Sequence, residues 1–184
     1  MGQNPYLTRL IALLAGEAVR SDGPFTLASG AVSAFYVDAR RVTFDAAGAA
    51  LVGRAVHAEL DPSVEALGGM TMGADPVAIA TAVVSAESDR PVRAFSIRKE
   101  AKAHGTGGRL VGAIRTGDHV AVIEDTTTTG SAFLEAVGVL EEAGTDIVQA
   151  IVLVDRSDGV FARLMAERGI AYRALATPAD LGVG

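Results

Sequence analysis

Apolar residues recur along the chain either in short continuous runs or at helical spacing. The runs that fit buried strands cover residues 64–70, 92–98, 119–125, 146–154 and 171–175. Between and after them, apolar spacing predicts helices over residues 76–87, 132–144 and 159–169. Strands that are apolar on both faces and alternate with helices predict an α/β fold, with a five-stranded parallel sheet flanked by helices.

The first 60 residues follow a different pattern. Asn4 and Pro5 form an N-cap and first-turn pair, and the apolar spacing that follows predicts a helix up to about Arg20. Residues 25–41, FTLASGAVSAFYVDARR, alternate apolar and small residues around a Ser-Gly turn, which predicts a strand pair leading to a loop. An alanine-rich stretch over about 45–60 predicts a second helix.

Composition limits the size and the setting of the protein. A chain of 184 residues with 49% hydrophobic content predicts one domain, residues 1–184. Cysteine is absent, and the three histidines, His57, His104 and His119, are too scattered to predict a preformed metal cage. The chain lacks a signal-peptide pattern and an apolar run of membrane-spanning length, so we expect a cytoplasmic protein with no membrane partner.

Charge is unevenly distributed along the sequence. The net charge of −6 argues against a nucleic-acid partner. Nevertheless, residues 93–115 hold six Lys or Arg residues against one acid, Glu100. Both lysines of the chain, Lys99 and Lys102, lie there, whereas arginine supplies positive charge everywhere else. Lysine differs from arginine in that its pKa can fall far enough for proton transfer.

The predicted strand over 119–125 ends in two adjacent acids, Glu124 and Asp125, and continues into four threonines, a glycine and a serine. Paired acids repel each other and β-branched residues resist helix formation. A bound polyol phosphate accounts for both features: the acids accept hydrogen bonds from sugar hydroxyls, and the segment after them forms an anion cradle at the start of a helix. An ordinary capped turn needs one such residue rather than six.

Two nucleotide-binding motifs are absent from the sequence. No Walker Gly-Lys-Ser/Thr ending occurs, and no G-x-G-x-x-G follows a strand. Residues 122–131, VIEDTTTTGS, resemble the motif of type I phosphoribosyltransferases that binds phosphoribosyl pyrophosphate (PRPP). The resemblance implies that the two acids bind the ribose hydroxyls and that the following loop binds the 5′-phosphate. The implied PRPP-binding residues of this motif are Glu124, Asp125, Thr126, Thr127, Thr128, Thr129, Gly130 and Ser131.

Three further segments narrow the resemblance to one family. Residues 98–108, RKEAKAHGTGG, resemble the catalytic loop of orotate phosphoribosyltransferases, R-K-x-x-K-x-H-G. Residues 25–40 resemble the orotate-binding segment of that family, and VDRSDG places Arg156 at the position of its orotate-side arginine. The resemblance implies the type I phosphoribosyltransferase fold, with a hood over about 1–44, a core over about 45–184 and a flexible catalytic loop.

The implied reaction needs cations near the leaving group. Displacing pyrophosphate from PRPP builds an oxocarbenium-like ribosyl group and releases a highly charged anion. The resemblance implies that Arg98, Lys99, Lys102 and His104 clamp the pyrophosphate, and that residues 69–75 wrap it with backbone groups. Lys102, His104 and Asp125 are the implied catalytic residues, with Lys102 and His104 as candidate proton donors. The implied cofactor is Mg2+, held mainly through PRPP.

Orotate is a flat pyrimidine that carries a carboxylate. Phe35 or Tyr36 would supply an aromatic face, Thr128 would contribute to the same site, and Arg156 would bind the carboxylate through two hydrogen bonds. Ordinary strand packing is the alternative for one of the two aromatic residues. A surface ion pair with Asp155 or Asp158 is the alternative for Arg156.

Two positions depart from the family pattern. Ala28 and Met72 stand where many relatives have lysine, so the expected donor pocket lacks two cations. Either PRPP binds with fewer direct charges, or arginines such as Arg40 or Arg41 compensate.

Other functions remain as alternatives to orotate phosphoribosyl transfer in pyrimidine biosynthesis. The chain could be a type I phosphoribosyltransferase for a purine or for uracil, or a non-catalytic PRPP-binding regulator. A purine enzyme would not need the arginine for a carboxylate, and a regulator would have little use for the basic loop. The resemblance also implies a homodimer with composite active sites, in which the loop lysine, the loop histidine and Arg98 act in the neighbouring subunit's site.

Overall fold

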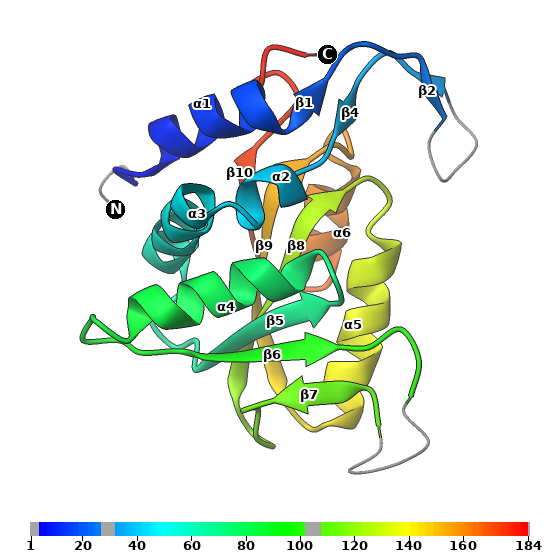
Figure 1. Cartoon of the computed structure of the whole chain (residues 1–184). Coiled ribbons are helices and arrows are strands. Elements are labelled where there is room, and N and C mark those ends of the chain that lie inside the picture. The colour runs from blue at the N-terminus through cyan, green and yellow to red at the C-terminus, as the bar shows by residue number, and fades with distance from the viewer. Residues whose placement is uncertain (1–3, 27–31, 102–107, 184) are drawn as a thin grey trace.

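The computed structural model describes residues 4–26, 32–101 and 108–183. Its main sheet contains β5 (Ala66–Met70), β6 (Arg93–Ile97), β7 (Leu110–Gly112), β8 (His119–Thr127), β9 (Asp146–Asp155) and β10 (Ala171–Ala176). The helices are α1 (Leu7–Glu17), α2 (Arg40–Thr43), α3 (Ala46–Glu59), α4 (Ala74–Ser85), α5 (Ser131–Glu142) and α6 (Val160–Glu167). Figure 1 shows the helices packed on both faces of this sheet.

The strand order is β10-β9-β8-β5-β6-β7, and every pairing is parallel except the pairing of β6 with β7. The five predicted parallel strands are therefore confirmed. The sixth strand, β7, is antiparallel and was not predicted from the sequence. Strand β8 also runs two residues beyond its predicted end at Asp125, because Thr126 and Thr127 continue the ladder opposite Val154 and Asp155.

Alternate residues of the central strands supply two separate cores. On one face, Ala121 and Ile123 pack with apolar residues of α1, α3 and α4. On the other face, Val120 and Val122 pack with α5 and α6. This period of two explains why β8 reads as a continuous apolar run, since both of its faces are buried.

The N-terminal region is built from short elements. Strand β1 (Val19–Arg20) pairs with β4 (Tyr36–Val37), and β2 (Phe25–Thr26) pairs with β3 (Val32–Ser33), both antiparallel. The β2–β3 pair matches the predicted strand pair. Residues 19–20, by contrast, were predicted to be helical and form β1.

The first helix begins later than the sequence predicts. Tyr6 occupies its N-cap position without a side-chain cap, while Asn4 Oδ1 accepts from the N–H of Tyr6 over 3.1 Å in the turn just before the helix. The Asn4 side-chain nitrogen donates to the carbonyl oxygen of Ala55 and to Glu59, each over 2.9 Å, so it ties the start of the chain to α3. Helix α3 agrees with its prediction, and the Asp45 carboxylate caps it by accepting from the N–H groups of Ala47 and Gly48.

No helix within the described residues is long and apolar enough to cross a membrane. Of the N-terminal predictions, the Ser29-Gly30 turn lies outside the described residues, as does the lysine-replacing Ala28.

Candidate active site

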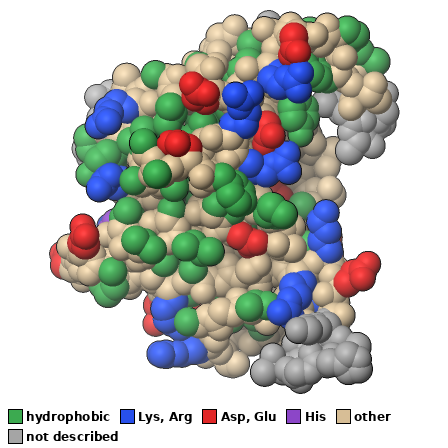
Figure 2. Space-filling model, viewed as in Figure 1, with side chains coloured by type: hydrophobic (Ala, Val, Ile, Leu, Met, Phe, Trp, Pro, Cys, Tyr) green, Lys and Arg blue, Asp and Glu red, His purple; other side chains and the backbone are tan. Residues whose placement is uncertain are grey.

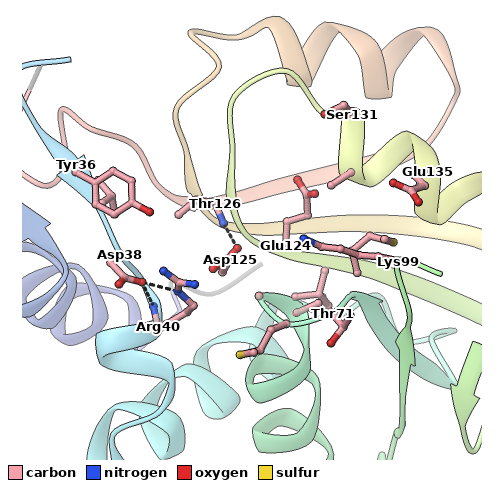
Figure 3. Close-up of a pocket in the computed structure, with 17 residues that line it drawn as sticks. Tyr36, Asp38, Arg40, Thr71, Lys99, Glu124, Asp125, Thr126, Ser131 and Glu135 are labelled. Atoms are coloured by element: carbon pink, nitrogen blue, oxygen red, sulfur yellow. Dashed lines mark hydrogen bonds and ion pairs between the residues drawn. The ribbon is translucent and has the colours of Figure 1, made fainter. Parts of the chain in front are cut away.

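A cavity of about 750 Å³ opens beside the carboxyl ends of β5, β6 and β8 (Figure 3). Its lining residues are Tyr36, Val37, Asp38, Arg40, Met70, Thr71, Met72, Gly73, Ala74, Lys99, Ile123, Glu124, Asp125, Thr126, Ser131, Ala132 and Glu135. Three of the segments singled out in the sequence, the pyrophosphate segment, the basic loop and the acidic-threonine motif, therefore meet in one cavity. This position is the usual ligand site of a parallel α/β sheet.

Glu124 is the more buried of the two adjacent acids. Only 8% of the residue's surface is exposed, and its Oε2 atom has no hydrogen-bond partner among the residues that the structure describes. Burial, together with the charge of the neighbouring Asp125, raises the pKa of Glu124 to about 7. Its carboxylate is therefore short of hydrogen-bond donors, which a sugar hydroxyl would supply.

Asp125 lies in the same cavity but has better support. Its Oδ1 atom accepts a hydrogen bond from the N–H of Thr126 over 2.8 Å. Burial raises the pKa of Asp125, while that N–H group and the positive charge of Arg40 oppose the rise. The two acids thus form a floor of hydrogen-bond acceptors at the end of β8.

The pyrophosphate segment approaches the acids very closely. A Cβ atom placed on Gly73 would overlap the Asp125 carboxylate. A larger residue there would force the Asp125 side chain to move, so glycine lets this loop pass beside the carboxylate in its observed position. The loop leads directly into α4, and Thr71 Oγ1 donates to Asp75 Oδ2 over 2.6 Å to hold it.

The predicted phosphate cradle is divided between strand, turn and helix. Thr126 and Ser131 line the cavity, whereas Thr127 is buried and Thr128 and Thr129 are exposed in the turn. Gly130 is the N-cap of α5, with φ of 75°, and therefore brings no capping side chain. The first N–H groups of α5 begin at Ser131 on the cavity wall, where the positive end of the helix dipole favours an anion.

The basic loop is anchored at its base. The N–H of Arg98 donates to the carbonyl oxygen of Arg109 over 2.8 Å, and Arg109 Nε donates back to the carbonyl oxygen of Arg98 over 2.7 Å. Arg109 also forms an ion pair with Glu135 of α5. Lys99 lies just beyond this anchor and lines the cavity, but the Arg98 side chain does not. The predicted catalytic residues Lys102 and His104 lie outside the described residues.

Three of the residues predicted to bind orotate lie near one another: Phe35 and Tyr36 of the hood, and Arg156, which directly follows β9. The Arg156 guanidinium carbon is 5.3 Å from the centre of the Phe35 ring, a cation–π distance. Burial lowers the pKa of Arg156, and its Nε atom is buried without a hydrogen-bond partner among residues 4–26, 32–101 and 108–183. Tyr36 lines the cavity itself, whereas Phe35, Arg156 and the exposed Thr128 do not.

The ion-pair alternative for Arg156 does not hold. The Asp155 carboxylate is occupied by the N–H of Ser157 and the Tyr172 hydroxyl, each at 2.7 Å. Within the part of the chain that the structure describes, Arg156 pairs with neither Asp155 nor Asp158. The N–H of Arg156 donates to the carbonyl oxygen of Thr127 over 2.9 Å, which joins this turn to the end of β8.

Two charged residues of the cavity wall, Asp38 and Glu135, were not assigned a role from the sequence. A third, Arg40, was one of two candidates for a compensating charge, and it lines the cavity. Glu135 had a detectable signal, because it lies four residues after Ser131 and so shares one face of α5. Asp38 and Arg40 lie two residues apart at the end of the segment predicted as a strand pair leading to a loop, where the pattern does not indicate which way a side chain points.

The cavity can hold an anion that also carries hydroxyl groups. It combines acceptor carboxylates, a helix start and the cations Arg40 and Lys99. In the described ranges, no group of three or more His, Cys, Asp or Glu side chains is arranged to hold a metal ion.

The chain is similar to known proteins over almost its whole length. No protein-family model matches it. It is 43% identical over 174 residues to the orotate phosphoribosyltransferase of Corynebacterium glutamicum, a match that covers 94% of this chain and 92% of the relative. It also resembles the crystal structure of Mycobacterium tuberculosis orotate phosphoribosyltransferase in complex with Fe(III) dicitrate, with a TM-score of 0.81 and 38% identity, over 97% of this chain and 100% of that one.

A second crystal structure of the Mycobacterium tuberculosis enzyme, in complex with PRPP, matches with a TM-score of 0.76 and 35% identity, over 97% of this chain and 100% of that one. These likenesses confirm the family predicted from the basic loop and from residues 25–40. The chain belongs to the orotate phosphoribosyltransferase family.

Proposed function

We propose that this chain transfers the phosphoribosyl group of PRPP to orotate, giving orotidine 5′-monophosphate and pyrophosphate in the synthesis of UMP. Membership of the family supports the reaction. The observation that carries the proposal is the pair of adjacent acids, Glu124 and Asp125, in a cavity that also holds Lys99 and the start of α5.

The donor fits the cavity group by group. Glu124 and Asp125 accept hydrogen bonds from the two ribose hydroxyls, which supplies the donors that Glu124 Oε2 lacks. The 5′-phosphate lies against Thr126 and the N–H groups at the start of α5, with the rest of the 127–131 loop closing around it. The pyrophosphate lies beside residues 70–74 and Lys99.

The reaction exchanges one bond at the anomeric carbon for another. The bond to the pyrophosphate oxygen breaks as a ring nitrogen of orotate forms a new bond to the same carbon. Positive charge develops on the ribose and negative charge on the departing pyrophosphate. The carboxylates near the ribose and the cations Arg98, Lys99, Lys102 and His104 near the pyrophosphate would stabilise these two charges.

The acceptor occupies the side of the cavity toward the hood. Tyr36 lies on the cavity wall, and Phe35 with Arg156 lies close by, so the flat ring packs near aromatic side chains and its carboxylate meets a guanidinium. Arg156 is suited to this role because its Nε–H lacks a partner within the described residues. Thr128 would complete the acceptor side from the neighbouring turn.

Magnesium would be held mainly through PRPP. Mg2+ prefers hard oxygen ligands and usually binds substrate phosphates while keeping several waters. Glu124 and Asp125 carry negative charge at the cavity floor, near the position of the Mg2+–PRPP complex. Bound with PRPP, Mg2+ would neutralise part of the charge that develops on the pyrophosphate.

A spectrophotometric assay tests the proposed reaction. We expect the purified protein to consume orotate only when PRPP and Mg2+ are both present, with one pyrophosphate released per orotate. Uracil, hypoxanthine and adenine should not be consumed in parallel reactions. If orotate is inert and another base reacts, the acceptor is wrong; if PRPP binds and no base reacts, the regulator alternative replaces the enzyme.

We also infer a homodimer with composite active sites. Ile79 and Val83 project from α4 with 58% and 65% of their surface exposed, and Met72 at the cavity rim is 59% exposed. Figure 2 shows hydrophobic side chains gathered over α4. Apolar surface of this kind is typical of a protein interface, and a second copy there would bring its basic loop close to this cavity.

Mixing two inactive variants tests the composite site. Lys102→Ala removes a loop residue, and Asp125→Ala removes an acid of the cavity floor. If each site combines residues of two subunits, heterodimers contain one intact site, so mixing should restore part of the activity. No recovery after confirmed subunit exchange would count against shared sites.

We also propose that residues 1–44, approximately, form a hood over the core. Tyr36, Asp38 and Arg40 on the cavity wall support this division of the chain.

A further inference from the structure

The cavity proposed for PRPP is lined by more acids than bases. Among the described residues, four carboxylates line it, those of Asp38, Glu124, Asp125 and Glu135, against the two cations Arg40 and Lys99. Asp38 is paired with Arg40 and Glu135 with Arg109, so Glu124 and Asp125 are the carboxylates that most strongly repel a pyrophosphate group. Each cation of this wall therefore has a large influence on donor binding.

Arg40 is held in place at one end of its guanidinium. Its Nε atom donates to Asp38 Oδ1 over 2.7 Å, and its backbone N–H donates to the same oxygen over 3.3 Å. Its two terminal nitrogens have no hydrogen-bond partner within residues 4–26, 32–101 and 108–183. Figure 3 shows the guanidinium on the hood side of the cavity, facing Asp125. Arg40 thus presents a fixed, two-pronged donor to the cavity.

The adjacent arginine does not share this position. Arg41 does not line the cavity and instead lies 3.9 Å from Glu17, with both side chains more than half exposed. Two arginines next to each other in sequence therefore point to different surroundings. Only Arg40 can contact a ligand that lies over Glu124 and Asp125.

Arg40 lies where the acceptor side of the cavity meets the donor side, because its neighbours include Tyr36 as well as Asp125. Arg40 shares its cavity with residues 70–74 and Lys99, which surround the proposed pyrophosphate position. The proposed cation on the orotate side is Arg156, which packs on Phe35 outside the lining of this cavity. An arginine on the wall of the donor cavity meets an anion that is otherwise faced by acids.

We propose that Arg40 binds the pyrophosphate group of PRPP and that Asp38 is the positioning residue that orients it. This inference rests on the proposed function, because it assigns one more binding residue to the same donor site. It also explains how the cavity works with Met72, an uncharged residue, on the pyrophosphate loop.

Paired substitutions at positions 40 and 41 test this role. Arg40→Gln should raise KM for PRPP and weaken the binding of magnesium pyrophosphate by about 10- to 100-fold, the range expected for a lost hydrogen bond to a charged group. Binding of ribose 5-phosphate and KM for orotate should change little. Arg41→Gln removes the same charge outside the cavity and should behave like the wild type in all four measurements.

A second substitution separates charge from structure. Met72 lines the same cavity and is 59% exposed, so Met72→Lys adds a cation there with little strain. In the Arg40→Gln background it should recover part of the lost pyrophosphate affinity, which repair of a folding defect would not do. Asp38→Asn should weaken pyrophosphate binding less than Arg40→Gln and should add little to it in the double variant.

The outcomes separate this inference from the proposed function. Equal behaviour of Arg40→Gln and Arg41→Gln in pyrophosphate titrations would overturn the role of Arg40, as would a loss confined to orotate. A wild-type protein that transfers to no base would overturn the proposed reaction. The pyrophosphate titrations would still decide the role of Arg40 in that case, because they need no turnover.

Discussion

The two ends of strand β8 carry buried acids in opposite surroundings. Asp118, just before the strand, is 5% exposed, and Glu124, near its carboxyl end, is 8% exposed. Asp118 accepts hydrogen bonds from Arg93 over 2.9 and 2.8 Å and from the N–H of Arg115 over 2.7 Å. Glu124 Oε2 has no partner among the described residues. Equal burial therefore does not imply an equal role: one acid stabilises the fold, and the other is left ready for a ligand.

The pKa values of the two acids shift in opposite directions. The Arg93 guanidinium holds the pKa of Asp118 below its usual range. Burial raises the pKa of Glu124 to about 7, and the charge of Asp125 adds to the rise. The fold thus favours negative charge at one end of β8 and opposes it at the end that faces the cavity.

The largest expected difference between the two ends is in activity. Asp125→Asn and Glu124→Gln should each lower kcat/KM by about 100- to 1000-fold, the size of a lost preorganised electrostatic contact in a transition state. Asp118→Asn should leave kcat/KM close to that of the wild type, because Asp118 lies at the far end of the strand. Initial rates of orotate consumption measure all three variants. A comparable loss for the folded Asp118→Asn protein would contradict the division of roles.

Stability should show the reverse order. Asp118→Asn should lower the free energy of unfolding by about 2 kcal/mol, because it breaks charged hydrogen bonds to Arg93. Glu124→Gln should raise the free energy of unfolding at about pH 8 by roughly 1–3 kcal/mol, because it removes a charge that burial disfavours more strongly than the Thr127 hydrogen bond favours it. Urea denaturation of the ligand-free proteins measures both changes. Destabilisation by Glu124→Gln at that pH would show that the Glu124 carboxylate has partners after all.

The pH dependence of stability should carry opposite signs at the two ends. Glu124 has a raised folded pKa, so its contribution to stability falls as pH rises from about 4.5 to about 7. Asp118 has a lowered folded pKa, so its contribution is present above roughly pH 4 and is lost as pH falls through the folded value. Glu124→Gln should flatten the neutral limb of the stability curve, and Asp118→Asn the acidic limb. Denaturation midpoints across the pH range test both signs.

The smallest effect concerns protons exchanged on binding. At pH 7 about half of the Glu124 side chains are protonated in the free protein. A ligand whose hydroxyls donate to the carboxylate favours its ionised form, so binding of PRPP should release up to about half a proton from Glu124 at pH 7 and almost none at about pH 9. Calorimetry in buffers with different ionisation enthalpies measures this release. Glu124→Gln should lack it, and uptake by the wild type would contradict the expected direction.

The sequence predicted the central framework because that framework repeats a simple pattern. The central strands β5, β8 and β9 are largely buried on both faces, and the segments at the carboxyl ends of the strands carry the acids, the threonines and the basic loop. Strand β7 was not predicted because it is only three residues long and ends at Gly112, which is too short for a period of two to be recognised. The hood strands are two residues each and are held by pairing with distant residues, such as Val19 with Val37.

The cavity wall was harder to predict than its floor. Glu124 and Asp125 stand out because two adjacent acids end an apolar strand. Asp38 and Arg40 look like ordinary surface charges, and their role depends on where α2 packs in three dimensions. The side chain of Thr127 is buried beside Glu124, because strand β8 continues beyond the acids and Thr127 pairs with Asp155 in the sheet.

Gly73 lies at the contact between two segments that are far apart in sequence, the entry to α4 and the end of β8. A side chain at position 73 would overlap the Asp125 carboxylate, so the entry to α4 and the end of β8 lie in direct contact only because residue 73 is glycine. A change in one loop must be matched by a change in its neighbour. Variation among relatives is therefore expected at the rim of the cavity, where side chains face open space, while the spacing at its base stays constant.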